Sequence, residues 1–76
     1  MKHVYATDLA MIARNGGGVT ASARRFVSTE LAMVARSLTG SAVLHVTHAE
    51  ALTSSDMAMI ARNARSPAYV MFSTTD

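Results

Sequence analysis

Two histidines and a glutamate lie close together in the segment His45-Val-Thr-His48-Ala-Glu50, and these residue types bind metals or exchange protons. On a strand, side chains three positions apart point to opposite faces, so we expect His45 and His48 to diverge. His48 and Glu50 share a face, but two ligands do not complete a zinc site. The pattern predicts no metal site and no cofactor. One alternative is a metal site that is shared between subunits or involves His3. Another is a small-ligand or enzymatic site at a subunit interface, built from His45, His48, Glu50 or an arginine.

No motif for nucleophilic catalysis or phosphate binding is present. Serine and threonine are abundant, but their positions are typical of helix caps, and no Gly-x-Ser-x-Gly sequence occurs. The run Gly16-Gly17-Gly18 follows a predicted helix instead of opening one, and no Gly-Lys-Ser/Thr comes after it. The five acidic residues are dispersed, so no carboxylate pair is available for acid–base work. We therefore predict no catalytic residues.

The basic residues give a formal net charge of +2. Arg24-Arg25 is the one adjacent basic pair, and with the other arginines it is suited to phosphate or an acidic partner. No aromatic residue alternates with these bases to stack on nucleotides. Weak nucleic-acid binding is therefore only a third hypothesis for the function, and we do not expect nucleic acid as a partner.

One nine-residue motif occurs three times, at Thr7–Asn15, Thr29–Ser37 and Ser55–Asn63. Each copy begins with Thr or Ser, followed by an acid that favours a helix start, and has arginine near its far end. Glycine follows the first two copies and Ser66-Pro67 follows the third, as helix stops do. The motif predicts helices near residues 7–15, 28–38 and 54–64, with N-caps at the first residue of each copy: Thr7, Thr29 and Ser55.

Apolar, β-branched segments lie between and after these helices. Residues 42–48 and 68–73 are predicted strands, and residues 19–26 form a weaker candidate because Ala, Arg24 and Arg25 are poor strand formers. Helices that alternate with strands favour an α/β fold. We expect one domain over residues 1–76, with three β–α-type units and helices on one side of a small, mostly parallel sheet. The alternative is a compact α/β sandwich.

The second and third units resemble leucine-rich repeats of the cysteine-containing type. In the second unit, the residues at that family's spacings are Ala23, Phe26, Leu31, Val34, Ala35 and Leu38. In the third unit, they are Leu44, Val46, Ala49, Leu52, Thr53, Met57, Ile60, Ala61 and Ala64. Ala23 and Ala49 stand where the family has Asn or Cys. The resemblance implies the shape of a β–α repeat and no particular activity.

A helical wheel of about 100° per residue divides each motif copy into two faces. The predicted core stripe contains Leu9, Ile12 and Ala13, with Leu31, Val34, Ala35, Met57, Ile60 and Ala61 at the equivalent positions. The predicted outer face contains Ala10, Met11, Arg14, Ala32, Met33, Arg36, Ala58, Met59 and Arg62. Two of its three positions in each copy are apolar, and methionine suits adaptable contacts. The face is either a tolerant surface or an interface with another copy or another protein.

These features predict a small protein-interaction or oligomerisation module that forms a homodimer or a larger assembly with itself. A chain of 76 residues without cysteine has little margin as a monomer. The interface is expected on the outer helix face or at the edge of the last strand, with Val70 and Phe72. The sequence shows no signal peptide and no membrane span, so we expect a cytoplasmic protein that does not bind a membrane.

Overall fold

The computed structural model describes residues 5–40, 42–64 and 69–74, in which helices and strands alternate along the chain. Each occurrence of the nine-residue motif lies in one helix, except that Asn15 of the first follows the last residue of its helix. The elements are α1 (Ala6–Arg14), β1 (Val19–Ser22), α2 (Ser28–Ser37), β2 (Val43–Thr47), the short 3-10 helix η1 (Ala49–Ala51), α3 (Ser54–Asn63) and β3 (Tyr69–Phe72).

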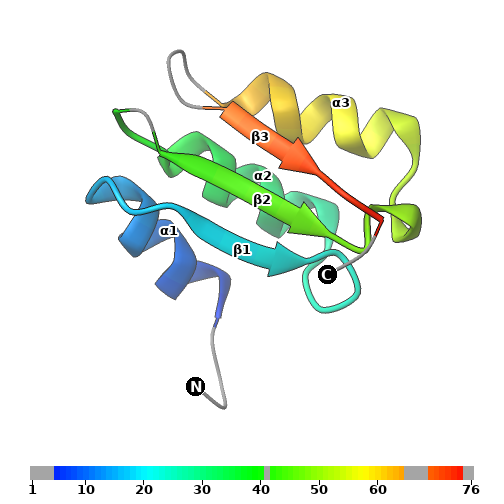
Figure 1. Ribbon diagram of the computed structural model, residues 1–76, viewed down its shortest axis with the longest axis horizontal. Coiled ribbons are helices and arrows are strands. Elements are labelled where there is room, and N and C mark those ends of the chain that lie inside the picture. The colour runs from blue at the N-terminus through cyan, green and yellow to red at the C-terminus, as the bar shows by residue number, and fades with distance from the viewer. Residues whose placement is uncertain (1–4, 41, 65–68, 75–76) are drawn as a thin grey trace.

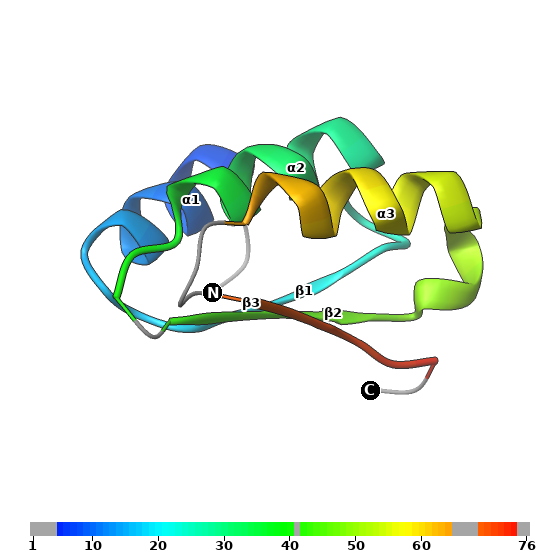
Figure 2. The same cartoon turned by 90° about the horizontal axis from the view of Figure 1, so that it is seen from above.

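The three strands form a parallel sheet in the order β1-β2-β3. All three helices lie on the same face of this sheet, so the molecule has two layers (Figures 1 and 2). Helix α2 packs against α1 on one side and against α3 on the other. The predicted α/β fold, with helices on one side of a small parallel sheet, is confirmed.

Helices α2 and α3 begin at the predicted residues, and α1 begins one residue earlier than predicted. Their N-caps are Tyr5, Val27 and Thr53, so the prediction of Thr7, Thr29 and Ser55 as caps is wrong by two positions. The acid of each motif is the third helical residue, and its carboxylate accepts a hydrogen bond from the backbone N–H of the N-cap. The oxygen–nitrogen distances are 3.1 Å for Asp8, 3.0 Å for Glu30 and 3.3 Å for Asp56. The acids therefore set the helix starts, through the carboxylate half of a capping box.

The end of α1 is closed by glycine and by the next helix–strand connection. Gly16 has a φ of +94°, a conformation that side chains rarely adopt, and the chain leaves the helix there. The Thr39 hydroxyl, which follows α2, lies 3.2 Å from the Ala13 carbonyl oxygen and 3.1 Å from that of Arg14. The connection after α2 thus satisfies backbone groups that α1 cannot satisfy by itself.

The strands match the prediction in position, and are shorter. Strands β2 and β3 lie within the predicted segments 42–48 and 68–73, while Ala68 and the expected stop at Ser66-Pro67 lie outside the described residues. The weak candidate at 19–26 forms a strand over Val19–Ser22 and then turns. The Phe26 N–H donates to the Ser22 carbonyl in that turn, which buries the Phe26 side chain at the end of the helix layer.

The core is centred on the middle unit, because α2 and β2 have neighbours on both sides. The largest fully buried side chains are Leu31, Val34, Leu38, Leu44, Val46 and Ile60. The predicted core stripe is wrong at Ile12, which is 40% exposed, and at Ala61, which is also exposed. Both residues lie on helices at the sides of the layer, where no further helix of the described chain covers them (Figure 1).

Ile60 and Ile12 occupy the same position of the motif, so they provide a matched pair of substitutions. We expect Ile60→Ala to lower the free energy of unfolding by about 2–5 kcal/mol, because Ile60 is fully buried. We expect Ile12→Ala to lower it by less than about 1 kcal/mol, because much of that side chain already contacts water. Urea denaturation of dilute samples measures both values. Equal losses would contradict the observed difference in burial.

Candidate functional site

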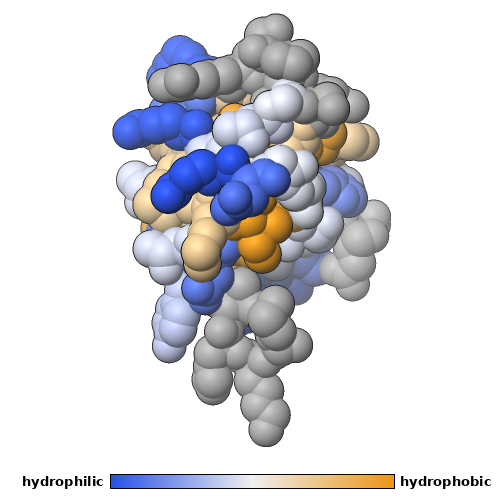
Figure 3. Space-filling model, turned by 90° about the vertical axis from the view of Figure 1, so that its left-hand side faces the viewer, coloured by the Kyte–Doolittle hydropathy of each residue, from blue (hydrophilic) through white to orange (hydrophobic). Residues whose placement is uncertain are grey.

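The predicted outer helix face is only partly at the surface. Met11 is exposed, whereas Met33 and Met59 are partly buried and pack against the core. Ala10 and Ala32, predicted to face outward, are buried, because helices at close spacing press their small residues together. The three arginines Arg14, Arg36 and Arg62 are exposed in the last turns of their helices. The end of the molecule where the helices finish shows apolar residues bordered by strongly hydrophilic ones (Figure 3).

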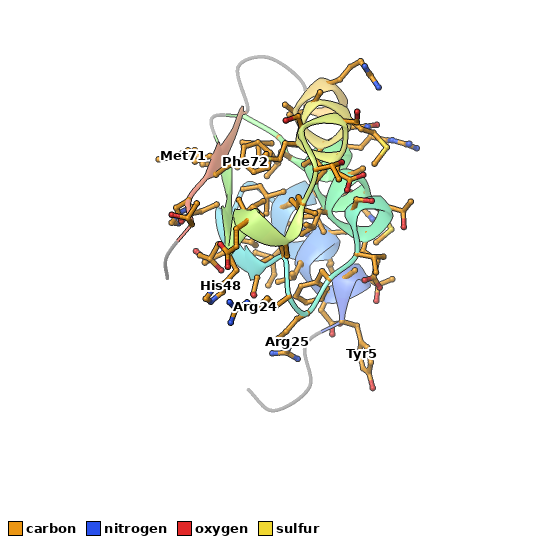
Figure 4. The ribbon with its side chains drawn as sticks, turned by 90° about the vertical axis from the view of Figure 1, so that its right-hand side faces the viewer. Tyr5, Arg24, Arg25, His48, Met71 and Phe72 are labelled. Carbon is orange, nitrogen blue, oxygen red and sulfur yellow. The ribbon has the colours of Figure 1, made fainter. Side chains whose placement is uncertain are left out.

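A polar cluster lies at the opposite end, beyond the carboxyl ends of the strands. The Arg24 guanidinium lies 3.2 Å from a Glu50 carboxylate oxygen, and His48 Nδ1 lies 3.7 Å from the same oxygen. Arg24 comes from the turn after β1, while His48 and Glu50 come from the connection after β2 (Figure 4). Because Arg24 and Glu50 are both well exposed, this bridge links two connections without adding much stability.

The acidity of Glu50 is shifted by its surroundings. Hydrogen bonding to its own backbone, and then the charges on Arg24 and His48, hold the pKa of Glu50 below its ordinary value of 4.5. His48 precedes it with a φ of 54°, in the left-handed region that few non-glycine residues adopt. The cluster therefore consists of a turn at His48, in a left-handed conformation, that the Arg24–Glu50 ion pair joins to the turn after β1.

His45 and His48 have different partners, but the strand geometry assumed in the prediction does not hold, because β2 ends at Thr47 and the chain bends at His48. His45 lies on β2 in register with Thr20 and Met71, and its Nε2 is 3.0 Å from the Ser73 hydroxyl. His48 instead interacts with Glu50 at the end of the strand. Within residues 5–40, 42–64 and 69–74, no three His, Asp or Glu side chains gather in a way that would hold a metal ion.

The first side of the helix layer, along α1, exposes residues that are buried elsewhere in the chain. Ile12 is 40% exposed, but Val34 and Ile60, at the same position of the motif, are 0% exposed. Met11 is 54% exposed, whereas its counterparts Met33 and Met59 pack against the core. The helices that bury this position both have a preceding helix beside them, and α1 has none among the described residues.

The last side of the layer, along α3, shows the complementary difference. Ala58 and Ala61 are exposed. At the same motif positions, α1 and α2 carry Ala10, Ala13, Ala32 and Ala35, all of which are at most 6% exposed. The helices that bury these alanines both have a following helix beside them. The sequence does not differ between copies here, so the exposure comes from position in the layer alone.

The outer strands leave backbone groups without a strand partner in the described sheet. Ala23 donates to the Thr47 carbonyl and Ser73 donates to the Val46 carbonyl, so these residues direct their backbone groups toward β2. Backbone groups alternate in direction along a strand. On β1, Thr20 therefore faces the outer edge. On β3, Val70 and Phe72 direct their N–H and C=O groups outward, while the Phe72 side chain packs against the core.

Sequence reasoning missed several exposed apolar side chains. The helical wheel predicts Ile12 in the core, and no sequence pattern marks Tyr5, Val27 or Met71. These last three residues are each at least half exposed. Met71 projects from the face of the sheet away from the helices, and Tyr5 projects from the start of α1 (Figure 4). A signal for Ile12 exists in the order of the three copies: α1 is the first described helix, and α2 lies on one side of it only.

No protein-family model matches the chain, and comparisons with curated proteins and with solved structures find no similar protein. The resemblance to leucine-rich repeats therefore stays a prediction. In the part of the chain that the structure describes, none of the helices has the length and apolar character needed to cross a membrane. The fold is that of a small two-layer α/β protein. The features that bear on its function are those of its surface.

The lowered pKa of Glu50 predicts an acid-sensitive contribution to stability. A carboxyl whose pKa is depressed by folding stabilises the folded state above its ordinary pKa of 4.5, and this contribution is lost as the pH falls through the lower folded value. We expect Glu50→Gln to reduce stability at pH 6 and to have a smaller effect at pH 3. Chemical denaturation at both pH values measures the difference. An equal effect at the two values would show that the charge of Glu50 contributes nothing.

Proposed function

We propose that this protein is a small interaction module that binds further copies of itself through the two sides of its helix–strand array. The observation that carries the proposal is the unequal burial of equivalent residues. Ile12 is 40% exposed where Val34 and Ile60 are 0% exposed, and Ala58 is exposed where Ala10 and Ala32 are buried. The chain thus displays, on both sides, surfaces of a kind that it buries internally.

The energetics favour contact through several groups together. Full burial of one isoleucine side chain contributes about 1.5–3 kcal/mol, while association costs on the order of 4–15 kcal/mol in lost freedom. Ile12 alone is therefore insufficient. Met11 beside it and the unpaired edge of β1 add apolar area and backbone hydrogen bonds on the same side of the molecule. The smallest assembly that uses such a surface is a homodimer.

Sedimentation velocity over a range of protein concentrations tests the proposal. We expect the average mass to rise above the chain mass of 8.0 kDa as the protein concentration increases through the micromolar range. A modest interface forms to a large extent only at high protein concentration. A folded protein that stays at the mass of one chain over the whole range would refute self-association.

Ile12→Glu tests the α1 side specifically. A carboxylate at this position must lose water when a second copy docks, so we expect the dissociation constant to rise at least about tenfold. Thr29→Glu is the matched control: it adds the same charge at an exposed position of the middle helix, in its first turn, where an acid is favoured. The control should assemble like the unmodified protein, and circular dichroism should show that both variants are folded.

The outer helix face is the competing surface, and Met33→Glu separates the two. Met33 is partly buried against the core, so it offers less free apolar area than Ile12. If a folded Met33→Glu protein loses assembly while Ile12→Glu retains it, copies contact each other through the outer faces of their helices. That result would refute the part of the proposal that places contacts at the sides of the array.

A further inference from the structure

We infer that the assembly is directional: the α1–β1 side of one copy docks on the α3–β3 side of the next, and so continues the order of helices and strands within the chain. The occupant of each exposed side is thus a second copy of this chain. This inference rests on the proposed function, because it specifies how the self-association occurs. Inside the chain the same kind of contact is already made twice, between α1 and α2 and between α2 and α3.

The two exposed sides are the separated halves of that internal contact. The position of Ile12 is buried only in helices that have a preceding neighbour, as Val34 and Ile60 show. The position of Ala58 is buried only in helices that have a following neighbour, as Ala10 and Ala32 show. Between two neighbouring helices, the later one thus buries a branched side chain at this position and the earlier one buries small side chains. The exposed isoleucine of one copy fits the exposed alanines of another in the same way.

The strand edges have the matching polarity. Within the sheet, the backbone groups of a strand that point toward the next strand bond to it. For example, the Val46 carbonyl on β2 accepts a hydrogen bond from the Ser73 N–H after β3. Val70 and Phe72 present the equivalent outward groups on β3, and Thr20 faces outward on β1. A parallel pairing of β3 with β1 of the next copy would therefore join unpaired groups of the two edges and keep all helices on one face.

A symmetric dimer would use neither the fit of isoleucine against alanine nor the parallel pairing of β3 with β1. Contact between two α1 sides would place Ile12 against Ile12 and would pair two β1 edges antiparallel. Neither arrangement occurs among the described residues: their strand pairs are all parallel, and branched residues at the Ile12 position are buried where a preceding helix lies beside them. A contact between unlike sides leaves one free side at each end of the dimer, so it adds further copies in one direction.

The arginines predict how salt affects this arrangement. Arg14, Arg36 and Arg62 hold the same position in successive helices, and all three are exposed. Docking of unlike sides brings Arg62 of one copy beside Arg14 of the next, at about the 8–10 Å spacing of packed helices. Added salt screens charges over about 10 Å at 0.1 M. We expect assembly to strengthen with salt, whereas an interface held by ion pairs would weaken.

Two variants that each block one side provide the decisive experiment. Ile12→Glu blocks the α1 side and leaves the α3 side intact. Ala58→Glu blocks the α3 side at an exposed mid-helix position, where glutamate is a good helix former, and leaves the α1 side intact. We expect each variant alone to be a folded monomer. An equimolar mixture should form a dimer of twice the 8.0 kDa chain mass, and nothing larger, in sedimentation velocity.

Other outcomes are distinguishable from this one. If Ala58→Glu or Ile12→Glu alone still dimerises, like sides pair with each other and the directional inference is overturned, although self-association stands. If the unmodified protein assembles and the mixture stays monomeric, the inference is again overturned. If the unmodified protein is a monomer at every concentration, the proposed function itself fails.

The strand edge is tested by Val70→Pro, with Val70→Ala as its control. Proline removes the outward N–H of Val70 but leaves the bonds toward β2. We expect this variant to behave like Ala58→Glu: monomeric by itself, unable to dimerise with Ala58→Glu, and able to dimerise with Ile12→Glu. The last result also shows that its α1 side is folded. Val70→Ala should still assemble. Assembly of Val70→Pro equal to that of Val70→Ala would exclude the strand edge from the interface.

Discussion

Lateral packing of each helix against its neighbours is the interaction on which the rest of the structure depends. One helix–strand unit of this size cannot bury its own apolar residues, because the sheet covers only one side of the helix. The units before and after it must cover the flanks. The middle unit has both neighbours, and it supplies most of the fully buried residues, including Leu31, Val34, Leu44 and Val46. The outer units have one neighbour each, and they expose what the middle unit buries.

The same constraint explains why the three motif copies have the same local structure but bury different residues. The acids Asp8, Glu30 and Asp56 each hold an N-cap backbone N–H, so the three helices start alike. This contact involves residues three positions apart and needs no neighbour. Burial of the alanines and branched residues does need one, so identical sequence positions have different environments.

The polar cluster at the carboxyl ends of the strands holds two turns together. The Arg24–Glu50 pair ties the turn after β1 to the turn after β2, and His48 accepts an unfavourable backbone conformation to make the second turn. Arg24 and Glu50 are exposed and His48 is partly buried, and Glu50 contacts both of the other side chains, so the cluster links the first and second units. The proposed self-association would also use the exposed apolar residues Ile12 and Met11, which a catalytic site at this end of the sheet would not.

The sequence by itself determined the number and order of the helices and strands, since cap acids, glycine stops and β-branched runs act through contacts of a few residues. It did not determine which residues cap the helices, nor which motif positions are covered. A helical wheel treats each copy alone and therefore placed Ile12 inside and Ala10 outside. Only the tertiary structure decided those positions, because the flank of a helix is buried or exposed according to whether another helix lies beside it.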